Sequence, residues 1–332
     1  MSDAQPPSPS AGQAAANAAA ANANATPADA GDPRGLQRLG QAMANAAATA
    51  RLLDVARDED LARAGDVTTA SVIPEAAEDA LVMRSRADGV VAGLVLLEPV
   101  VRAFDAKLHV ELLASDGDRV APGDVLARIR GPVRGILTVE RTMLNLVSHL
   151  SGIATRTREA VDAVRGTKAA ICDTRKTIPG MRHLQKYAVV CGGGTSHRAG
   201  LHDAALFKDN HLAALPDGPL NETLRPALIK AGLREGLRFV MVEVDTLQQL
   251  DELLQIEDDF IDIILLDNMS PETMANAVAR RNARRPRWQL EASGGITPEA
   301  VRAVAESGVD RISLGALTHS VTCFDVGLDA ER

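Results

Sequence analysis

The chain is organised around the stretch CDTRKTIPGMRHLQKYAVVCGGGTSHRAGLHDAALFKDNH, which runs from Cys172 to His211. It holds six lysine or arginine side chains against three aspartates, in a protein whose formal net charge is −8. Its glycine run, Gly192 to Gly194, has no Cβ atoms, so the backbone can turn sharply there or approach a ligand closely. Cations gathered beside such a turn predict a small polyanion as ligand, and a solvated basic face is the alternative.

The composition sets limits on the class of protein. A chain of 332 residues, 46% of them hydrophobic, is long enough for about two domains, and with only 2% aromatic residues its core must be aliphatic. The acidic balance argues against a nucleic-acid partner, and no apolar run of roughly 18 residues predicts a membrane span. Cys172, Cys191 and Cys323 lack metal-ligand spacing and fit a reducing compartment. No secretory pattern opens the chain, so we expect a cytoplasmic protein.

Sequence character changes along the chain and suggests domain boundaries. Residues 1–35 are rich in Ala, Asn and Pro and cannot bury enough surface to offset their ordering entropy, so we expect a disordered tail. Residues 36–153 read as a small α+β domain with an antiparallel sheet, because short alternating segments such as 80–86 and 89–97 are separated by turn residues. A helix follows, for which Thr138 is a candidate N-cap. The pattern DG-x-V-x-x-G-x-x-L also occurs in lipoyl and biotinyl carriers, but no carrier lysine follows it.

From residue 154 to 317 the pattern becomes strand, loop and helix, repeated, and residues 318–332 form a C-terminal segment. Six apolar segments are candidate strands: 169–172, 204–207, 238–244, 261–266, 289–292 and 311–314. Their spacing is that of one βα unit, which predicts parallel strands with crossover helices. A closed eight-unit barrel takes about 250 residues, so this shorter region predicts an incomplete α/β barrel.

Chemically useful residues stand at the carboxyl ends of these strands, where barrels carry their active sites. Glu243 and Asp267 are suited to ribose hydroxyls or a magnesium ion, which prefers carboxylate oxygens and substrate phosphates. Two glycine turns, Ser293-Gly294-Gly295 and the one at Gly315, offer loop N–H groups to a phosphate. The pairs Arg175-Lys176 and His197-Arg198 offer donors to carboxylates, although a lone histidine is more often a satisfied core residue.

These motifs together resemble the quinolinate phosphoribosyltransferase family, also called nicotinate-nucleotide pyrophosphorylase (carboxylating). The resemblance covers the chain from roughly Arg51 onward. It rests on the stretch from Cys172 to His211, with ERTMLN upstream and VEVD, LLDN, EASGGI and SLGALTHS downstream. It implies an open, incomplete α/β barrel plus a smaller N-terminal α/β sandwich domain. It also implies a homodimer whose active sites are shared between subunits, with a trimer of dimers as a further assembly. The implied reaction joins quinolinate to phosphoribosyl pyrophosphate and releases carbon dioxide and pyrophosphate, giving nicotinate mononucleotide for NAD biosynthesis.

The resemblance assigns roles to residues that match its motifs. Lys176, Glu243 and Asp267 would be catalytic, and Mg²⁺ would be held by Glu243 and Asp267 through substrate hydroxyls or water. The quinolinate pocket would consist of Arg175, Lys176, His197, Arg198 and Lys208, with Arg141 from the partner subunit. Phosphoribosyl pyrophosphate would be held by Glu243, Asp267, Ser293, Gly294, Gly295, Gly315, Ala316 and His319. Val190 and Ser196 depart from the family pattern, which has Arg and Asn at these two positions.

The sequence leaves three other hypotheses about the function open. A molybdenum-associated paralogue shares this fold, although the complete cationic set counts against it. A Schiff-base aldolase using Lys208 is a different class, since neighbouring cations can activate a barrel lysine. A non-catalytic sensor of phosphate ligands is the third, and the retained Glu243, Asp267 and both glycine turns count against it.

Overall fold

The computed structural model describes residues 33–331, so the tail expected at 1–35 lies almost wholly outside the described residues. Two compact units make up the described chain. The first contains residues 33–155, Thr177–Gly193 and 321–331, and the second contains Arg156–Lys176 and Gly194–Ser320. The chain therefore passes between the units several times, whereas the sequence pattern suggested one boundary near residue 154. No helix in this part of the chain is long and apolar enough to cross a membrane.

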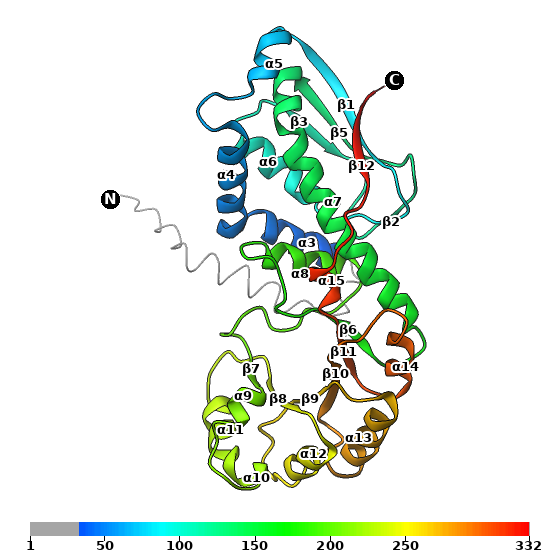
Figure 1. Cartoon of the computed structure of the whole chain (residues 1–332). Coiled ribbons are helices and arrows are strands. Elements are labelled where there is room, and N and C mark those ends of the chain that lie inside the picture. The colour runs from blue at the N-terminus through cyan, green and yellow to red at the C-terminus, as the bar shows by residue number, and fades with distance from the viewer. Residues whose placement is uncertain (1–32, 332) are drawn as a thin grey trace, which may run out of the picture. The chain divides into compact units, whose positions relative to one another are not determined.

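The first unit is built on a four-stranded antiparallel sheet with the order β12-β1-β5-β3 (Figure 1). Its strands are β1 (Glu78–Ser85), β3 (His109–Leu112), β5 (Val125–Pro132) and β12 (Val326–Ala330). Strand β12 comes from the last residues of the chain and pairs with β1, so that Leu81 lies opposite Ala330. A separate two-stranded ladder joins β2 (Gly89–Val90) to β4 (Arg119–Val120).

The helices of the first unit are α3 (Pro33–Ala44), α4 (Ala47–Leu61), α5 (Val67–Val72), α6 (Leu97–Ala103), α8 (Arg182–Cys191) and most of α7 (Val133–Ala163), with the 3₁₀ helix η1 (Leu94–Leu96). The expected strand at 89–97 is wrong beyond Val90, because the chain enters η1 after Gly93, whose φ of 100° ends the extended run. The N-cap expected at Thr138 is also wrong. Helix α7 begins at Val133, and the Thr138 hydroxyl donates to the carbonyl of Arg134 inside the helix.

The second unit is a parallel sheet of six strands in the order β6-β11-β10-β9-β8-β7. These are β6 (Ala170–Cys172), β7 (Ala205–Phe207), β8 (Val240–Val244), β9 (Ile263–Asp267), β10 (Gln289–Ser293) and β11 (Arg311–Ser313), all within two residues of the predicted segments. Strands β6 and β7 stand at the two ends of this order, so the barrel is open, as expected. Outside β6 the sheet gains only an isolated parallel bridge from Cys172 to Thr195.

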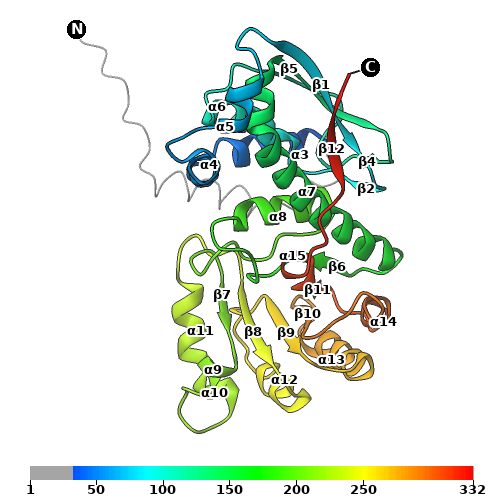
Figure 2. The same ribbon diagram turned by 45° about the horizontal axis from the view of Figure 1, so that its top comes forward.

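Helices connect successive strands and cover the outer side of this sheet, as Figure 2 shows for α11 to α14. They are α9 (Asp209–Leu212), α10 (Leu220–Thr223), α11 (Arg225–Gly232), α12 (Leu247–Leu253), α13 (Pro271–Arg284) and α14 (Val301–Glu306). A further helix, α15 (Ala316–His319), follows β11, the last of these strands along the chain. Helix α13 ends in a basic run, Arg280-Arg281-Asn282-Ala283-Arg284-Arg285, of which one side chain is buried. Arg281 is buried and pairs with Asp310 at 3.0 Å.

On the inner face of the parallel sheet, apolar side chains are followed by charged side chains toward the carboxyl ends of the strands. Ala204, Phe239, Met241, Ile263 and Leu265 form one buried cluster, against which Leu206 packs. Side chains two residues apart on a strand share a face. Lys208, Glu243 and Asp267 each come two residues after a member of that packed group, so they continue its face toward the carboxyl ends. The sheet therefore changes from hydrophobic to charged along its own inner surface.

Candidate active site

The carboxyl ends of the second unit's strands surround a cavity of about 860 Å³. Nearly all the residues that the sequence singled out line it: Arg175, Lys176, His197, Arg198, Lys208, Glu243, Asp267, Ser293, Gly294, Gly295, Gly315, Ala316 and His319. Most come from the ends of the strands and the loops that follow them, His197 and Arg198 come from the loop between α8 and β7, and Ala316 and His319 come from α15. The parallel arrangement explains this convergence, because the carboxyl ends of all the strands meet at one rim.

Arg141 is the one predicted residue that does not join the others. It lies on the part of α7 that belongs to the first unit, and its side chain is exposed. Arg141 does not line the cavity. Of the two departures from the family pattern, neither lines the cavity: Val190 is buried on α8, and Ser196 is buried with its hydroxyl donating to the carbonyl of His197.

Three acidic side chains line this cavity, and two of them, Glu243 and Asp267, stand at the ends of the neighbouring strands β8 and β9. Glu243 is buried, and its Oε2 accepts a hydrogen bond from Lys208 Nζ at 2.5 Å. Asp267 is half-buried, and its Oδ2 accepts from Asn268 Nδ2 at 2.6 Å. Within residues 33–331, no group of three or more His, Cys, Asp or Glu side chains forms a metal cage. Two carboxylates suit a Mg²⁺ ion that takes its remaining ligands from water and substrate oxygens.

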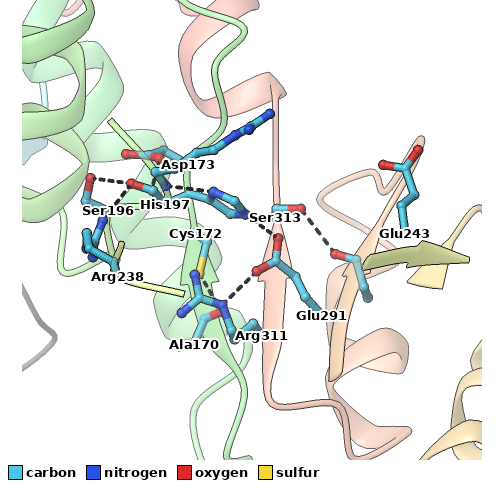
Figure 3. A network of polar contacts seen from close by, with 12 residues as sticks. Ala170, Cys172, Asp173, Ser196, His197, Arg238, Glu243, Glu291, Arg311 and Ser313 are labelled. Carbon is cyan, nitrogen blue, oxygen red and sulfur yellow. Dashed lines mark hydrogen bonds and ion pairs between the residues drawn. The ribbon is translucent and has the colours of Figure 1, made fainter. Parts of the chain in front are cut away.

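Buried polar contacts hold the loop that carries His197 and Arg198, which has no regular secondary structure (Figure 3). The backbone N–H of His197 donates to Asp173 Oδ1 at 2.9 Å, and its carbonyl accepts from Arg238 Nη1 at 3.3 Å. On the side chain, Nε2 lies 3.2 Å from Glu291 Oε1. The other carboxylate oxygen of Glu291 accepts from Arg311 Nε at 2.7 Å. These side-chain contacts fix the backbone of the loop, as backbone hydrogen bonds fix a helix or a strand.

The first glycine turn depends on a left-handed backbone. Gly294 has a φ of 91° and Gly295 a φ of 56°. A Cβ at Gly294 would lie 2.2 Å from Oδ1 of Asn268, so only glycine fits there. Helix α14 does not begin until Val301, so a phosphate at this turn would depend on loop N–H groups.

The second glycine turn lies close to Lys176. A Cβ at Gly315 would come 2.9 Å from Cδ of Lys176. The hydroxyl of Thr318 donates to the carbonyl of Lys176 at 2.7 Å, which ties the turn after β11 to the loop after β6. This places a lysine beside a candidate phosphate turn within the same cavity.

Several lining residues were missed from the sequence: Arg156, Thr174, Asn268, Glu291, Thr297, Ser313 and Ser320. A signal was available for two of them. Glu291 and Ser313 lie two residues before Ser293 and Gly315 on their strands, so side-chain alternation puts each on the face that leads to the cavity. Arg156 and Asn268 come from a helix and a turn, where no such period applies.

Comparison with known proteins agrees with this geometry. Residues 66–151 match the quinolinate phosphoribosyl transferase N-terminal domain, and residues 153–329 match the C-terminal domain of the same family. A nicotinate-nucleotide pyrophosphorylase (carboxylating) of Mycobacterium leprae is 46% identical over 289 residues, which is 83% of this chain and 97% of the relative. A probable enzyme of the same name from Bacillus subtilis is 40% identical over 265 residues, covering 80% of this chain and 88% of that one.

Solved structures are similar throughout the fold. The nicotinate-nucleotide pyrophosphorylase of Francisella tularensis aligns with a TM-score of 0.76 at 35% identity and covers 86% of this chain and 96% of its own. That of Ehrlichia chaffeensis aligns with a TM-score of 0.75 at 36% identity, with coverage of 85% and 98%. Both domains, the cavity and the relatives lead to one assignment: this chain belongs to the quinolinate phosphoribosyl transferase family.

Proposed function

We propose that this protein transfers a phosphoribosyl group from phosphoribosyl pyrophosphate to the ring nitrogen of quinolinate and decarboxylates the product. Nicotinate mononucleotide, pyrophosphate and carbon dioxide would be the products, as a step of NAD biosynthesis. One observation carries the proposal. A single cavity gathers seven cationic or imidazole side chains, three carboxylates and two glycine turns, and these include the groups that a dicarboxylate and a phosphoribosyl donor need. The names of the relatives support the same reaction.

Quinolinate would be held by charge and by fixed donors. Arg175 and Arg198 can each bind a carboxylate in bidentate fashion, while Lys176 and Lys208 act as point charges. Because these groups stand on strand ends and on a tightly held loop, they can orient the ring nitrogen toward the sugar with little reorganisation. Arg141 would reach this cavity from the partner subunit of a homodimer with shared sites, and a trimer of dimers would preserve such sharing.

The donor would lie across the carboxylates and the glycine turns. Ser293, Gly294, Gly295, Gly315, Ala316 and His319 would bind its 5′-phosphate, and Glu243 and Asp267 would hold its ribose hydroxyls. Mg²⁺, held by the same two carboxylates through water or hydroxyls, would neutralise charge on the pyrophosphate leaving group. As the bond from C1′ to pyrophosphate breaks, positive charge develops on the sugar. The buried carboxylate of Glu243 would stabilise that charge.

Decarboxylation requires fewer interactions with the protein than the transfer step does. After N-ribosylation the ring is cationic, and it can accept the electron pair left when the bond to the departing carboxylate breaks. A proton then replaces the lost carbon dioxide. Holding the remaining carboxylate and the phosphoribosyl group in place is then the main requirement. The proposal extends to a cytoplasmic location, which the three free cysteines support.

The test is incubation of the protein with quinolinate, phosphoribosyl pyrophosphate and Mg²⁺. Nicotinate mononucleotide and carbon dioxide should appear in equal amounts, measured by chromatography and by release of labelled carbon dioxide. Nicotinate is the control acceptor, and it should be used poorly because the cationic pocket is suited to two carboxylates. Equal turnover of nicotinate, or no nucleotide product, would contradict the proposal.

A further inference from the structure

Glu291 is a completely buried carboxylate in the wall of the cavity. Its side chain leaves β10 on the same face as Ser293 and points into the network of Figure 3. Taking an ionised carboxylate out of water costs several kcal/mol unless it is paired. Burial alone would raise the pKa of Glu291, but its interactions with His197 and Arg311 lower it to about 2. The group is therefore an anion in a cavity otherwise suited to binding anions.

The two oxygens of this carboxylate have different partners. Oε2 accepts from Arg311 Nε at 2.7 Å, and Oε1 faces His197 Nε2 at 3.2 Å. Arg311 alone would be enough to balance the charge. The approach of the second oxygen to His197 therefore indicates a role in orienting that ring.

The imidazole of His197 has a defined tautomer. Its Nδ1 accepts a hydrogen bond from the backbone N–H of Arg198 at 2.7 Å, so the ring hydrogen must be on Nε2, which faces Glu291. The edge-to-face contact with Phe239, with ring centroids 5.3 Å apart and planes at 87°, leaves the ring little freedom to rotate. The ring thus connects the buried carboxylate to the backbone amide of Arg198.

We propose that Glu291 is a positioning residue, which holds His197 in its Nε2–H tautomer and, through it, holds the backbone of Arg198 in the orientation that binds a dicarboxylate. This inference rests on the proposed function. Glu291 touches no substrate in this scheme, and its effect passes through His197. Loss of the carboxylate should therefore weaken the binding of quinolinate more than that of the phosphoribosyl donor.

The test variant is Glu291→Gln, which keeps the size of the side chain. If the amide oxygen accepts from Arg311, the amide NH₂ faces His197 Nε2 and favours the other tautomer. That tautomer places a hydrogen on Nδ1, against the N–H of Arg198. We expect KM for quinolinate to rise about tenfold or more, with KM for phosphoribosyl pyrophosphate changed much less.

The matched control is Asp310→Asn. Asp310 precedes β11 and pairs with Lys168 and Arg281 outside the cavity, so this change should lower Tm and leave both KM values unchanged.

A double-mutant cycle separates positioning from a direct role. If Glu291 acts through His197, the variant carrying both His197→Ala and Glu291→Gln should bind quinolinate no more weakly than His197→Ala alone. Multiplied effects in the double variant would overturn the proposal. An unchanged quinolinate KM in a folded Glu291→Gln protein would also overturn it.

The tautomer can be measured without any substrate. In protein labelled with nitrogen-15 histidine, the two neutral tautomers give different nitrogen shifts, and the His197→Ala variant identifies the signal. The Nε2–H form is expected in the ligand-free wild type, and the Nδ1–H form would overturn the proposal even if Glu291→Gln failed to fold. If wild-type protein made no nicotinate mononucleotide, the proposed function would fail. The shift measurement would still show whether Glu291 orients the ring.

Discussion

Lys208 Nζ donates a hydrogen bond to Glu243 Oε2 at 2.5 Å, which joins the end of β7 to the end of β8. In the proposed reaction Lys208 would bind quinolinate and Glu243 would bind the ribose of the donor. Glu243 is the more buried partner, with 8% of its side chain exposed, against 44% for Lys208. The carboxylate therefore depends on the ammonium group more than the reverse, and this asymmetry can be measured.

Replacing Lys208 with Met should abolish quinolinate turnover and lower Tm, because Glu243 is left buried without its partner, at a cost of about 1–3 kcal/mol. In the double variant Lys208→Met/Glu243→Gln the unpaired charge is gone. Its Tm should recover toward the wild-type value while activity stays lost. Calorimetric melting with a turnover assay checks both. A double variant less stable than Lys208→Met would show that the pair is not the source of the loss.

Gly294→Ala should weaken binding of phosphoribosyl pyrophosphate, because the new Cβ would meet Asn268 and the backbone has a left-handed φ. The control is Gly236→Ala, at a φ of 81° with no atom within 4 Å of the new Cβ. Both changes carry a backbone cost of roughly 1–2 kcal/mol, but only the first should raise the donor KM, by about tenfold or more if one phosphate hydrogen bond is lost. Equal KM values for the two variants would remove Gly294 from the phosphate site.

Arg141→Ala and Lys176→Ala should each lower quinolinate turnover at least about tenfold, since each removes a charge-assisted bond worth ~1.5–3 kcal/mol. Mixing the two impaired proteins under conditions of subunit exchange should restore activity. One site in each mixed dimer would then combine an intact Arg141 from one chain with an intact Lys176 from the other. Exchange should be verified with differently tagged subunits. A mixture no more active than its parents, despite exchange, would mean that the site is built within one chain.

Acid should destabilise the fold through His183. Its Nε2 lies 2.8 Å from Thr49 Oγ1, whose own hydrogen is donated to the carbonyl of Met43. Burial, with a smaller effect from the charge of Arg51, lowers the pKa of His183 from 6.5 to about 4. The unfolded chain therefore binds more protons between these values. This contribution to stability is complete above pH 6.5 and is lost as the pH falls toward 4, with a slope of at most about 1.4 kcal/mol per pH unit.

Denaturant unfolding at several pH values checks this slope. The variant His183→Gln should show a weaker dependence on pH over the same range. His109→Gln changes an exposed histidine of β3 and should behave as the wild type does. If His183→Gln kept the full wild-type slope, another group would be responsible.

Local sequence features predicted much of the barrel. All six parallel strands lie within two residues of the predicted segments, because a buried strand bounded by polar or glycine residues is a short-range pattern. Residues such as Asp267 and Ser293 could be proposed for the site because strand ends in a parallel sheet share one rim. The strand expected at 89–97 is wrong beyond Val90, because the chain turns at Gly93 and residues 94–103 are helical.

Other features required the folded chain. Nothing near Leu328 indicates that it pairs with Met83, since strand partners far apart in the sequence are chosen by the shared burial of two faces. Likewise Arg281 belongs to a basic run that looks solvated, yet it is buried against Asp310. In the sequence Glu291 is an ordinary strand residue, and only in the folded chain does the loop at His197 lie against it.

The sequence by itself determined which segments become the strands of the barrel, where the barrel's chemically active rim lies and which family the chain resembles. These properties follow from spacing along the chain and from the identities of side chains. Tertiary structure alone decided that β12 completes the N-terminal sheet, that β6 and β7 are the two end strands of the open barrel, and that Glu291 faces His197. These depend on which distant surfaces exclude water together, and no local period in the sequence records that choice.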